Sequence, residues 1–363
     1  MSFDPDKPFN DLPLLPPKAE LESKAVLRKA IAANKALAEL KGAGELIPNQ
    51  AILINSIPLQ EARYSSEIEN IVTTNDALFR AAAVDSSATD PATKEVLRYR
   101  AALHHGYEQL AKRPLSTKMM IELCGILLNA DIDVRKIPGT VVDNPATGKV
   151  FYTPPVGEKI IRDKLSNLEK FIHASNDMDP LVKMAVAHYQ FEAIHPFADG
   201  NGRTGRILNL LFLVERNLLK IPVLYLSRYI IQHKNDYYRL LRGVTADEAW
   251  EPWLLYMLTA VEEMALWTRD RVSAIRSLLE KTVALCRNKL PPRIYSRELI
   301  DTIFYQPYCK IGFLVEADIA ERKTAAVYLQ RLEDIGVLKS VKAGRERIFL
   351  NPKLLDLLRG QEN

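Results

Sequence analysis

The chain is poor in cysteine and in long apolar runs. Its 363 residues include only three cysteines, Cys124, Cys286 and Cys309. They are far apart and lack the spacing of metal ligands or of a disulfide framework, so we expect reduced thiols. The richest apolar run, residues 207–214, contains Asn209 and is much shorter than the roughly 18 residues that span a membrane. Residues 1–15 do not have the pattern of a signal peptide. These absences predict a soluble, cytoplasmic protein with no membrane partner.

The chain also has little excess charge of either sign. Its 49 basic and 45 acidic residues leave a net charge of +4, which does not by itself imply a nucleic-acid partner. The hydrophobic share of 47% and the charged share of 26% are ordinary for a soluble globular protein. The length is enough for two or three domains with full cores.

Glycine and charge are concentrated in residues 195–206, which read His-Pro-Phe-Ala-Asp-Gly-Asn-Gly-Arg-Thr-Gly-Arg. The apolar residues 207–215 that follow predict a buried helix, so residues 200–202 would lie at its N-terminus. Free backbone N–H groups and the helix dipole favour an anion at such a place, and glycine lets a phosphate approach closely. This stretch therefore predicts a site for an anion.

The side chains of this stretch add chemistry to the anion site. Arg203 and Arg206 are three residues apart, hence on one helical face, and a guanidinium fork suits phosphate oxygens. His195 is a candidate base, and Asp199 is a candidate carboxylate ligand for a metal. The residues therefore predict a polyphosphate site with a general base and a divalent cation. The alternative is a tight turn before a helix, with the arginines paired to acidic neighbours.

The same stretch resembles the signature of the Fic family, His-x-Phe-x-(Asp/Glu)-Gly-Asn-Gly-Arg-x-x-Arg, with every fixed position present. The resemblance implies a mainly helical Fic-type core that transfers AMP from ATP to a protein hydroxyl, with Mg²⁺ bound. Phosphoryl-type transfer needs mostly positioning and charge stabilisation, so a base, a cation and fixed donors suffice. A histidine of near-normal pKa is partly neutral at pH 7 and can act as the base.

The resemblance also implies a role for each matching position. His195 would take the proton from the attacking Ser, Thr or Tyr hydroxyl, and Asp199 would hold Mg²⁺ between the α- and β-phosphates. Phe197 would anchor the loop, Arg203 would grip the β-phosphate and Arg206 would reach the γ-phosphate. Glycine at position 202, where a kinase-like branch has lysine, favours AMP transfer. The loop residues expected to bind the nucleotide are His195, Pro196, Phe197, Ala198, Asp199, Gly200, Asn201, Gly202, Arg203 and Arg206.

An upstream stretch, residues 65–70, reads Ser-Ser-Glu-Ile-Glu-Asn and resembles the family's inhibitory motif, (Ser/Thr)-x-x-x-Glu-(Gly/Asn). The resemblance implies an inhibitory helix in which Ser65, Glu69 and Asn70 act together and Glu69 pairs with Arg206 at the nucleotide site. That pairing would block the γ-phosphate. The residues alone also allow a capping box, Ser66-x-x-Glu69, that starts a helix, and both interpretations can hold at once.

Residues 140–153 interrupt the helical pattern with two β-prone runs around a turn-rich segment, which predicts a hairpin. In the family a hairpin here, the flap, pairs with the backbone of the target protein and fixes its hydroxyl near the histidine, which is recognition by strand addition. We expect Val150, Phe151 and Tyr152 to form the docking edge. A plain solvent-exposed hairpin is the alternative.

Residues 229–238 resemble the family's nucleoside-contacting helix. The family usually has asparagine where His233 stands, so His233 is either a nucleotide contact or a surface histidine. Tyr237 and Tyr238 either stack on adenine or fill the core, which is commoner. Gln190 is a further candidate for a nucleotide contact.

The organisation predicted for the chain has three parts. Residues 1–94 form an N-terminal helical segment that carries the inhibitory helix, residues 95–285 the Fic catalytic core, and residues 286–363 a winged-helix domain. In the first part, apolar residues at spacings of three and four predict a helix over residues 26–40 that Gly42 ends. In the second part we expect helices over residues 117–129, 157–176, 180–194 and 246–273. The three tryptophans should lie in the core: Trp250, Trp253 and Trp267.

The last part predicts helices over residues 297–304, 315–320 and 323–335, then strands over 337–341 and 347–350. This order resembles a winged helix, a common DNA-binding unit. Its charge is only slightly positive, so a protein-interaction or packing role is at least as well supported as DNA binding.

The sequence as a whole predicts an auto-inhibited protein adenylyltransferase that uses ATP and Mg²⁺ and docks its protein substrate on the flap. Self-modification and a homodimer are compatible with it. One rival is a winged-helix DNA-binding regulator whose Fic-like core only senses nucleotide; sensing would not need His195 or Asp199. Another is an enzyme that transfers phosphate, UMP or phosphocholine, or removes AMP.

Overall fold

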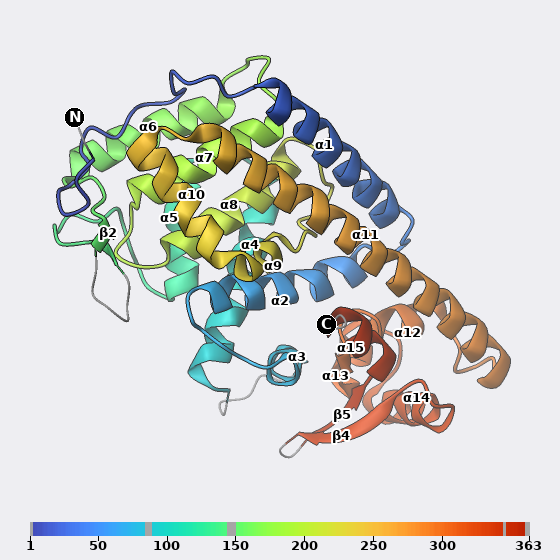
Figure 1. Ribbon diagram of the computed structural model, residues 1–363. Coiled ribbons are helices and arrows are strands. Elements are labelled where there is room, and N and C mark those ends of the chain that lie inside the picture. The colour runs from blue at the N-terminus through green and yellow to red at the C-terminus, as the bar shows by residue number, and fades with distance from the viewer. Residues whose placement is uncertain (1–2, 84–88, 144–149, 344–345, 360–363) are drawn as a thin grey trace.

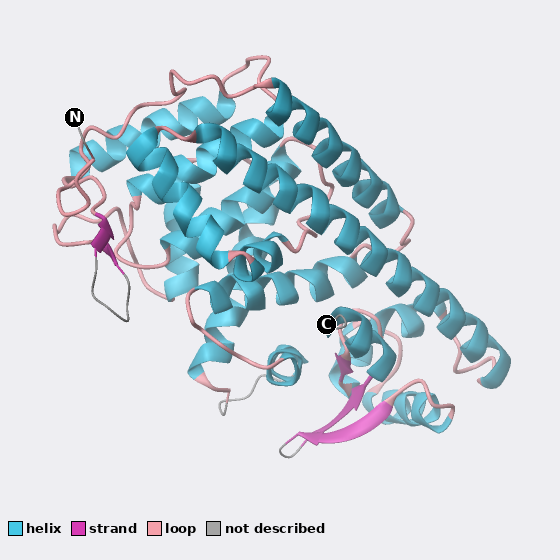
Figure 2. Cartoon of the chain, in the orientation of Figure 1, coloured by secondary structure: helices cyan, strands magenta, loops and turns pink. Residues whose placement is uncertain are grey.

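The computed structural model describes residues 3–83, 89–143, 150–343 and 346–359, and the described chain is mainly helical, as predicted (Figures 1 and 2). The helices are α1 (Lys24–Glu45), α2 (Ala51–Ile68), α3 (Asn75–Ala83), α4 (Pro91–Leu110), α5 (Thr117–Leu128), α6 (Glu158–His173), α7 (Pro180–Ile194), α8 (Asn201–Glu215), α9 (Leu226–Gln232), α10 (Lys234–Asp247), α11 (Trp250–Lys289), α12 (Arg297–Thr302), α13 (Ile311–Glu316), α14 (Arg322–Asp334) and α15 (Pro352–Arg359). The strands are β1 (Val142–Asp143), β2 (Val150–Tyr152), β3 (Tyr308–Cys309), β4 (Lys339–Ala343) and β5 (Glu346–Leu350).

α1 and α11 lie side by side, run in the same direction and form one side of the molecule (Figure 1). The stripe predicted for α1 is buried: Val26, Ala30, Ala33, Leu37 and Leu40 are all at most 1% exposed. The prediction that Gly42 ends this helix is wrong, because α1 continues to Glu45. Packing against α11 outweighs the cost of about 1 kcal/mol that glycine adds in a helix.

α11 is much longer than the predicted helix over residues 246–273. It starts at Trp250 and continues to Lys289, so it is about 60 Å long. Its buried face extends through Val272, Ile275, Leu279 and Cys286, and this packing carries the helix beyond the predicted end. The division predicted at residue 285 falls inside α11, and the one at residue 94 falls inside α4. As predicted, Trp250 and Trp253 are buried and Trp267 packs against the core.

Two helices, α7 and α8, cross the centre of the fold and carry the loop between them. All but two residues of α7 are buried, and α8 is buried from Arg203 to Leu213. α4, α5 and α2 pack against α8, while α6 and α11 pack against α7. The predicted helices over residues 117–129, 157–176 and 180–194 are confirmed as α5, α6 and α7 within a few residues at each end.

The start of α7 is fixed by Asp179, whose Oδ1 accepts hydrogen bonds from the N–H groups of Leu181 (2.8 Å) and Val182 (3.3 Å). Its Oδ2 also accepts one from Asn34 of α1 at 2.9 Å. We expect Asp179→Ala to lower the free energy of unfolding by about 1–2 kcal/mol, because a helix N-cap and a tertiary contact are lost together. Urea unfolding followed by circular dichroism measures this change. The exposed neighbour Asp177, replaced by alanine, is the control and should change stability by less than about 0.5 kcal/mol.

The predicted hairpin is present as the antiparallel pair β1 and β2, with Val142 opposite Tyr152. Its turn, residues 144–149, lies outside the described residues, and residues 140 and 141 are not part of a strand. The N-terminal segment runs beside the base of the hairpin, where the N–H of Phe9 donates to the carbonyl of Thr153 at 2.9 Å. The ring of Phe9 meets that of Tyr152 edge to face.

The C-terminal part has the order helix, strand, helix, helix, hairpin, with the sheet order β3-β5-β4, and this order is consistent with the predicted winged helix. The helix predicted over residues 315–320 is wrong in position: α13 spans Ile311–Glu316 and ends before Asp318, which has a left-handed conformation with φ of 52°. Two elements were not predicted, β3 and α15. β3 has two residues, too few for a visible alternation, and α15 buries Leu354, Leu355 and Leu358.

The winged helix touches the beginning of α2 and α3. The side-chain amide of Asn49 donates to the hydroxyl of Tyr305 at 3.1 Å, and Tyr308 hydrogen-bonds Asp76. α15 also packs against α2 and α11. Within the described residues, none of the helices combines the length and the apolar character that a membrane crossing requires.

Candidate active site

The loop of residues 195–200 connects the end of α7 to the start of α8. His195 caps α7 in a left-handed conformation, with φ of 48°, and its N–H donates to the carbonyl of Phe191 at 3.0 Å. This conformation is uncommon for a residue with a side chain and is seen mostly where the surroundings fix it. Because the next residue, Pro196, cannot continue the helix, the chain turns sharply and leaves the histidine at the rim of the loop.

The imidazole of His195 is held so that one nitrogen is available. Its Nδ1 lies 3.3 Å from the carbonyl of Glu192, which only accepts, so Nδ1 carries the proton and the neutral ring leaves Nε2 as an acceptor. Nε2 has no hydrogen-bond partner among the described residues. Burial lowers the pKa of His195 to about 4, which corrects the expectation of a near-normal pKa. The ring is therefore neutral at pH 7 and suited to accept a proton.

Arg135, which belongs to none of the predicted sites, fixes the loop by donating hydrogen bonds to backbone carbonyls. Its Nε donates to the carbonyl of His195 at 2.7 Å and its Nη2 to the carbonyl of Pro155 at 2.5 Å. Its backbone N–H donates to the carbonyl of Pro196 at 2.9 Å. A lone arginine before the hairpin carries no local pattern, so only the folded chain identifies this role.

At the start of α8 the first backbone N–H groups have no partner within the helix, as predicted for this position. Gly200 is the N-cap with φ of 80°, and the first backbone hydrogen bond of the helix runs from Thr204 N–H to Gly200 carbonyl at 2.9 Å. The N–H groups of Asn201, Gly202 and Arg203 precede that bond and have no partner within the helix. The side chain of Asn201 is engaged elsewhere: it accepts from the N–H of Phe197 at 2.9 Å and donates to the carbonyl of Phe197 at 2.8 Å. Asn201 therefore shapes the loop with its side chain and offers an anion only its backbone N–H.

Phe197 anchors the loop, as its expected role requires, because its ring is 1% exposed and faces Phe191 of α7. Ala198 and Asp199 are exposed at the tip of the loop. The carboxylate of Asp199 accepts from the N–H of Gly200 at 2.6 Å through Oδ1, and Oδ2 lies 3.5 Å from Nη2 of Arg203.

The surroundings of Asp199 fit a magnesium ion shared with phosphate oxygens. Its side chain is 71% exposed and stands beside the free amides of α8. Mg²⁺ is typically held by one or two carboxylates plus phosphate oxygens and water, so a single aspartate is sufficient. The described residues contain no cluster of three or more His, Cys, Asp or Glu side chains that could bind a metal without a substrate.

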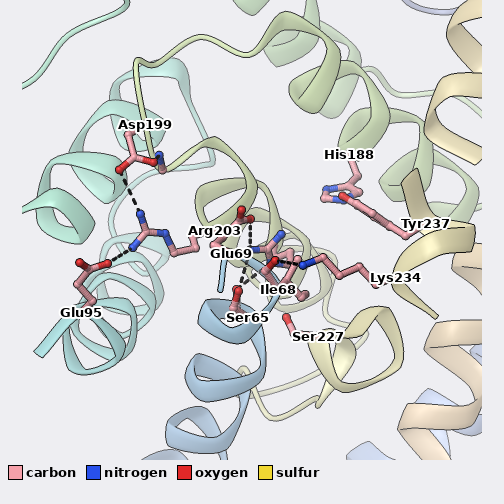
Figure 3. A network of polar contacts seen from close by, with 12 residues as sticks. Ser65, Ile68, Glu69, Glu95, His188, Asp199, Arg203, Ser227, Lys234 and Tyr237 are labelled. Carbon is pink, nitrogen blue, oxygen red and sulfur yellow. Dashed lines mark hydrogen bonds and ion pairs between the residues drawn. The ribbon is translucent and has the colours of Figure 1, made fainter. Parts of the chain in front are cut away.

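The two arginines of α8 are both buried and paired with acids on different helices (Figure 3). Nη1 of Arg203 donates to Glu95 of α4 at 2.9 Å. Arg206 is directed toward α2: its Nε donates to the hydroxyl of Ser65 at 2.8 Å and its Nη2 to the carbonyl of Ser65 at 2.9 Å. Nη2 also donates to Oε1 of Glu69 at 2.8 Å. The structure thus brings Ser65, Glu69 and Arg206 into one network, as the upstream motif predicts.

Electrostatics make the contact between Glu69 and Arg206 a strong ion pair. Burial alone would raise the pKa of Glu69, but the charge and hydrogen bond of Arg206 outweigh it and lower that pKa. Burial likewise opposes the charge of Arg206, yet the carboxylate of Glu69 raises the pKa of the guanidinium. Both groups are therefore charged at neutral pH, and the guanidinium of Arg206 is engaged by the carboxylate of Glu69.

Glu69 lies at the end of α2, so the alternative of a capping box that starts a helix is wrong. The helix starts at Ala51, and the hydroxyl of Ser66 is buried with no partner among the described residues. Asn70 follows in a left-handed conformation with φ of 62°, which stops the helix in the way that asparagine often does. Nζ of Lys234, from α10, donates to the carbonyl of Ile68 at 2.5 Å and fixes this end (Figure 3).

Gly202 is needed where α8 meets Glu69. A Cβ at this position would lie 2.4 Å from Oε1 of Glu69 and 2.9 Å from Nη1 of Arg206. A side chain here would therefore collide with the ion pair, and it would also cover the amides at the start of α8.

The more distant candidates have other contacts. The side-chain amide of Gln190 is buried and donates to the carbonyl of Pro13 at 2.8 Å, so it holds the N-terminal segment against α7. His233 stands between α9 and α10, stacks on Tyr229 and has Nδ1 3.0 Å from the carbonyl of that residue. Tyr237 fills the core and contacts His188 at 2.8 Å, whereas Tyr238 is 41% exposed.

In the hairpin, Val150, Phe151 and Tyr152 are half-buried, and the hydroxyl of Tyr152 donates to the carbonyl of Ala193 at 2.7 Å. That bond attaches β2 to the last turn of α7, two residues before His195. The hairpin and the histidine are thereby held in a fixed relation to each other.

Comparison with known families accounts for most of the chain. Residues 27–108 match the model of the Fic/DOC family N-terminal region, and residues 114–213 match that of the Fic/DOC family itself. The chain carries the domains of the Fic/DOC family. Residues 278–354 match the C-terminal domain of SoFic-like protein adenylyltransferases.

Curated relatives of this Fic chain share shorter stretches. A probable protein adenylyltransferase of Aquifex aeolicus is 35% identical over 83 residues, covering 23% of this chain and 25% of the relative. The protein adenylyltransferase fic-1 of Caenorhabditis briggsae is 37% identical over 92 residues, covering 24% of this chain and 17% of the relative. The matched stretches thus span a quarter or less of the length of these relatives.

Solved structures agree on the Fic fold. A Fic family protein from Desulfovibrio desulfuricans G20 superposes with a TM-score of 0.54 at 19% identity, covering 91% of this chain and 96% of that one. Fic-1 from C. elegans superposes with a TM-score of 0.51 at 18% identity, covering 70% of this chain and 75% of that one. At these identities the likeness concerns the fold.

Proposed function

We propose that this protein transfers AMP from ATP to hydroxyl groups of proteins and that the pairing of Glu69 with Arg206 holds this activity low. The observation that carries the proposal is a neutral imidazole, with Nε2 available, beside a helix start whose first N–H groups have no partner among the described residues. An imidazole of this kind is a base, and such a helix start is a site for phosphate. The protein adenylyltransferases among the curated relatives support the same reaction.

In the proposed reaction the triphosphate of ATP lies against the N–H groups of Asn201, Gly202 and Arg203. Nε2 of His195 accepts the proton of a Ser, Thr or Tyr hydroxyl while the hydroxyl oxygen attacks the α-phosphorus. A bond between that phosphorus and the target oxygen forms, the bond to the bridging oxygen breaks, and pyrophosphate leaves. The amides and Arg203 stabilise the charge that develops on the phosphate oxygens. Asp199 would hold Mg²⁺, which neutralises phosphate charge when bound.

Auto-inhibition follows because the guanidinium of Arg206 already has hydrogen-bond partners. In the structure its guanidinium is used by Ser65 and Glu69, so it is not available to a γ-phosphate. The carboxylate of Glu69 also places a negative charge beside Gly202, where the phosphates would lie. The carboxylate of Glu69 and the phosphates would both be negative and close together, and like charges repel strongly in a partly buried site.

The target protein is proposed to dock along β2 by strand addition. The hydroxyl of Tyr152 fixes that strand to α7, so a hydroxyl presented at the hairpin would have a constant position relative to His195. The same arrangement allows the chain to modify itself or a second copy in a homodimer.

For the winged helix we propose a packing or protein-interaction role rather than DNA binding. Its basic side chains are partly neutralised: Arg347 pairs with Glu333 at 2.6 Å and Arg331 with Asp334 at 3.4 Å. DNA binding depends on basic groups free to contact phosphates. A gel-shift assay at physiological salt, with and without ATP, tests this; a shift of DNA would favour the regulator hypothesis.

Intact-mass spectrometry tests the transferred group. The Glu69→Gly variant is incubated with Mg²⁺ and, in separate reactions, ATP, GTP, UTP and CDP-choline. We expect the mass of one or more AMP groups to be added with ATP. A gain of phosphate, UMP or phosphocholine, or a loss of AMP from a labelled protein, would replace the proposed reaction with another.

The pKa of His195 predicts the pH dependence of transfer. Because burial lowers that pKa to about 4, the ring is neutral above about pH 5, and the rate should fall only as the pH drops through about 4. We therefore expect kcat/KM for ATP in the Glu69→Gly variant to show no inflection near pH 6.5. A loss of activity with a midpoint near pH 6.5 would contradict the lowered pKa of His195.

A further inference from the structure

A second cleft lies between α2 and α4, away from the loop of residues 195–206. Its volume is about 450 Å³, and its walls come from α2, from α4 and from the segment before α9. The apolar part of the wall includes Ile54, Pro58, Leu103 and Pro222, and the ring of Tyr107 and the methyl group of Ala101 also line the cleft. None of the residues that line it belongs to the candidate active site, so the mechanism proposed above does not use this space.

Arg100 gives the cleft a positive charge without a matching acid. It lines the cleft, is only partly exposed, and no ion pair involves it among the described residues. Burial lowers the pKa of this guanidinium, and no neighbouring carboxylate counteracts the effect. A partly buried cation without a protein partner is stabilised when an anion from solution binds to it.

The other titratable groups of the cleft do not supply that anion. Glu108 lies 3.5 Å from Nδ1 of His104, and its side chain is 60% exposed. His105 lies 3.5 Å from Glu122, which also pairs with Arg113. The histidines therefore face carboxylates, whereas Arg100 does not. The cleft therefore combines the unpaired guanidinium of Arg100 with an apolar wall.

The cleft borders the weakest point of α2. Pro58 has no N–H, so the carbonyl of Ile54 receives no hydrogen bond from the residue four positions on. Both residues line the cleft. Ser65 and Glu69 follow about two and three turns later on the same helix. A ligand that contacts this part of α2 therefore contacts the helix that positions Glu69 against Arg206.

We propose that this cleft is an effector site for a small organic anion. Arg100 pairs with the phosphate or carboxylate of the ligand, and Ile54, Pro58 and Leu103 cover its aromatic or aliphatic body. Occupancy shifts α2 at Pro58 and changes how firmly Glu69 holds Arg206. This second half of the proposal rests on the auto-inhibited transferase proposed above, and the first half does not.

Binding is tested by calorimetric titration of the full chain with phenyl phosphate. We expect binding to weaken at least tenfold in Arg100→Met, since a charge-assisted bond is worth about 1.5–3 kcal/mol. Arg98→Met, on the same helix but outside the cleft, is the matched control and should bind as the native chain does. Inorganic phosphate should bind more weakly than phenyl phosphate because it lacks the apolar body.

A third variant separates the cleft from the active site, which also attracts phosphate. Binding that survives in Arg203→Met and is lost in Arg100→Met supports the cleft. The reverse pattern, or equal binding in the native chain and Arg100→Met, overturns the proposal. Thermal unfolding of each variant shows whether it is folded, and Arg100→Lys, which keeps the charge, should restore part of the affinity if Arg100→Met is unstable.

The coupling to Glu69 is tested by the rate of AMP labelling with and without saturating phenyl phosphate. We expect the rate of the native chain to change at least twofold and the rates of Arg100→Met and Glu69→Gly to stay constant. Binding without any change in the native rate would refute the coupling. If Glu69→Gly shows no labelling at all, the proposed transferase fails instead, and the binding result stands by itself.

Discussion

Replacement of His195 by alanine should lower the rate of AMP transfer about 10²–10⁴-fold, the range over which a positioned general base usually acts. The structure gives the reason: Nδ1 of the ring is held by the carbonyl of Glu192, and Nε2 is left to accept the proton. The comparison is made in the Glu69→Gly background, so that inhibition does not hide the loss. Labelling with ATP that carries a tagged α-phosphate measures the rate.

The control for this prediction is His173→Gln at the end of α6, where Nε2 of the histidine lies 2.6 Å from the carbonyl oxygen of Leu115, outside the loop of residues 195–200. It should label at the rate of its parent. ATP binding should remain within a few-fold of the parent in His195→Ala, because the amides and arginines are untouched. Transfer that continues at the parental rate in His195→Ala would remove the histidine from the reaction.

Glu69→Gly should raise the labelling rate roughly 10–100-fold over the native chain. The hydrogen bond between the charged groups of Glu69 and Arg206 is worth about 1.5–3 kcal/mol, and about 1.4 kcal/mol corresponds to a tenfold change in rate. Nη2 of Arg206, now 2.8 Å from the carboxylate, would become available to a γ-phosphate. The negative charge beside Gly202 would disappear in the same step.

Two further variants distinguish the carboxylate from the helix that carries it. Glu69→Gln keeps the shape but loses the charge, so it should activate nearly as much as glycine. Glu67→Ala, in the same turn of α2, leaves the ion pair intact and should have little effect. Equal labelling by the native chain and Glu69→Gly would dispose of the inhibitory role.

The sequence predicted the end of α7 and the start of α8 around residues 195–200 well, because the signals there are local. His195, the glycines and the apolar run after residue 206 are consecutive, and they fix the end of α7 and the start of α8. The pairing of Glu69 with Arg206 spans 137 positions and was predicted only through the resemblance to the Fic family. Without the resemblance, the residues predicted a capping box, Ser66-x-x-Glu69, at the start of a helix. In the structure Glu69 lies at the end of a helix instead.

Where prediction failed, packing between distant segments decides the structure. Gly42 does not end α1 because α11 supports that helix, and α11 extends to Lys289 for the same reason. Arg135 and Glu95 complete the site from other parts of the chain, and no local pattern marks either of them. The pKa of His195 could not be read from the sequence, since it depends on the burial that the folded loop imposes.

The central claim is tested most directly by a crystal structure of the Glu69→Gly variant with Mg²⁺ and a non-hydrolysable ATP analogue. We predict the triphosphate against the N–H groups of Asn201, Gly202 and Arg203, Arg206 on the γ-phosphate, and Nε2 of His195 facing the α-phosphorus. A nucleotide bound elsewhere, or one whose α-phosphorus points away from His195, would contradict the account.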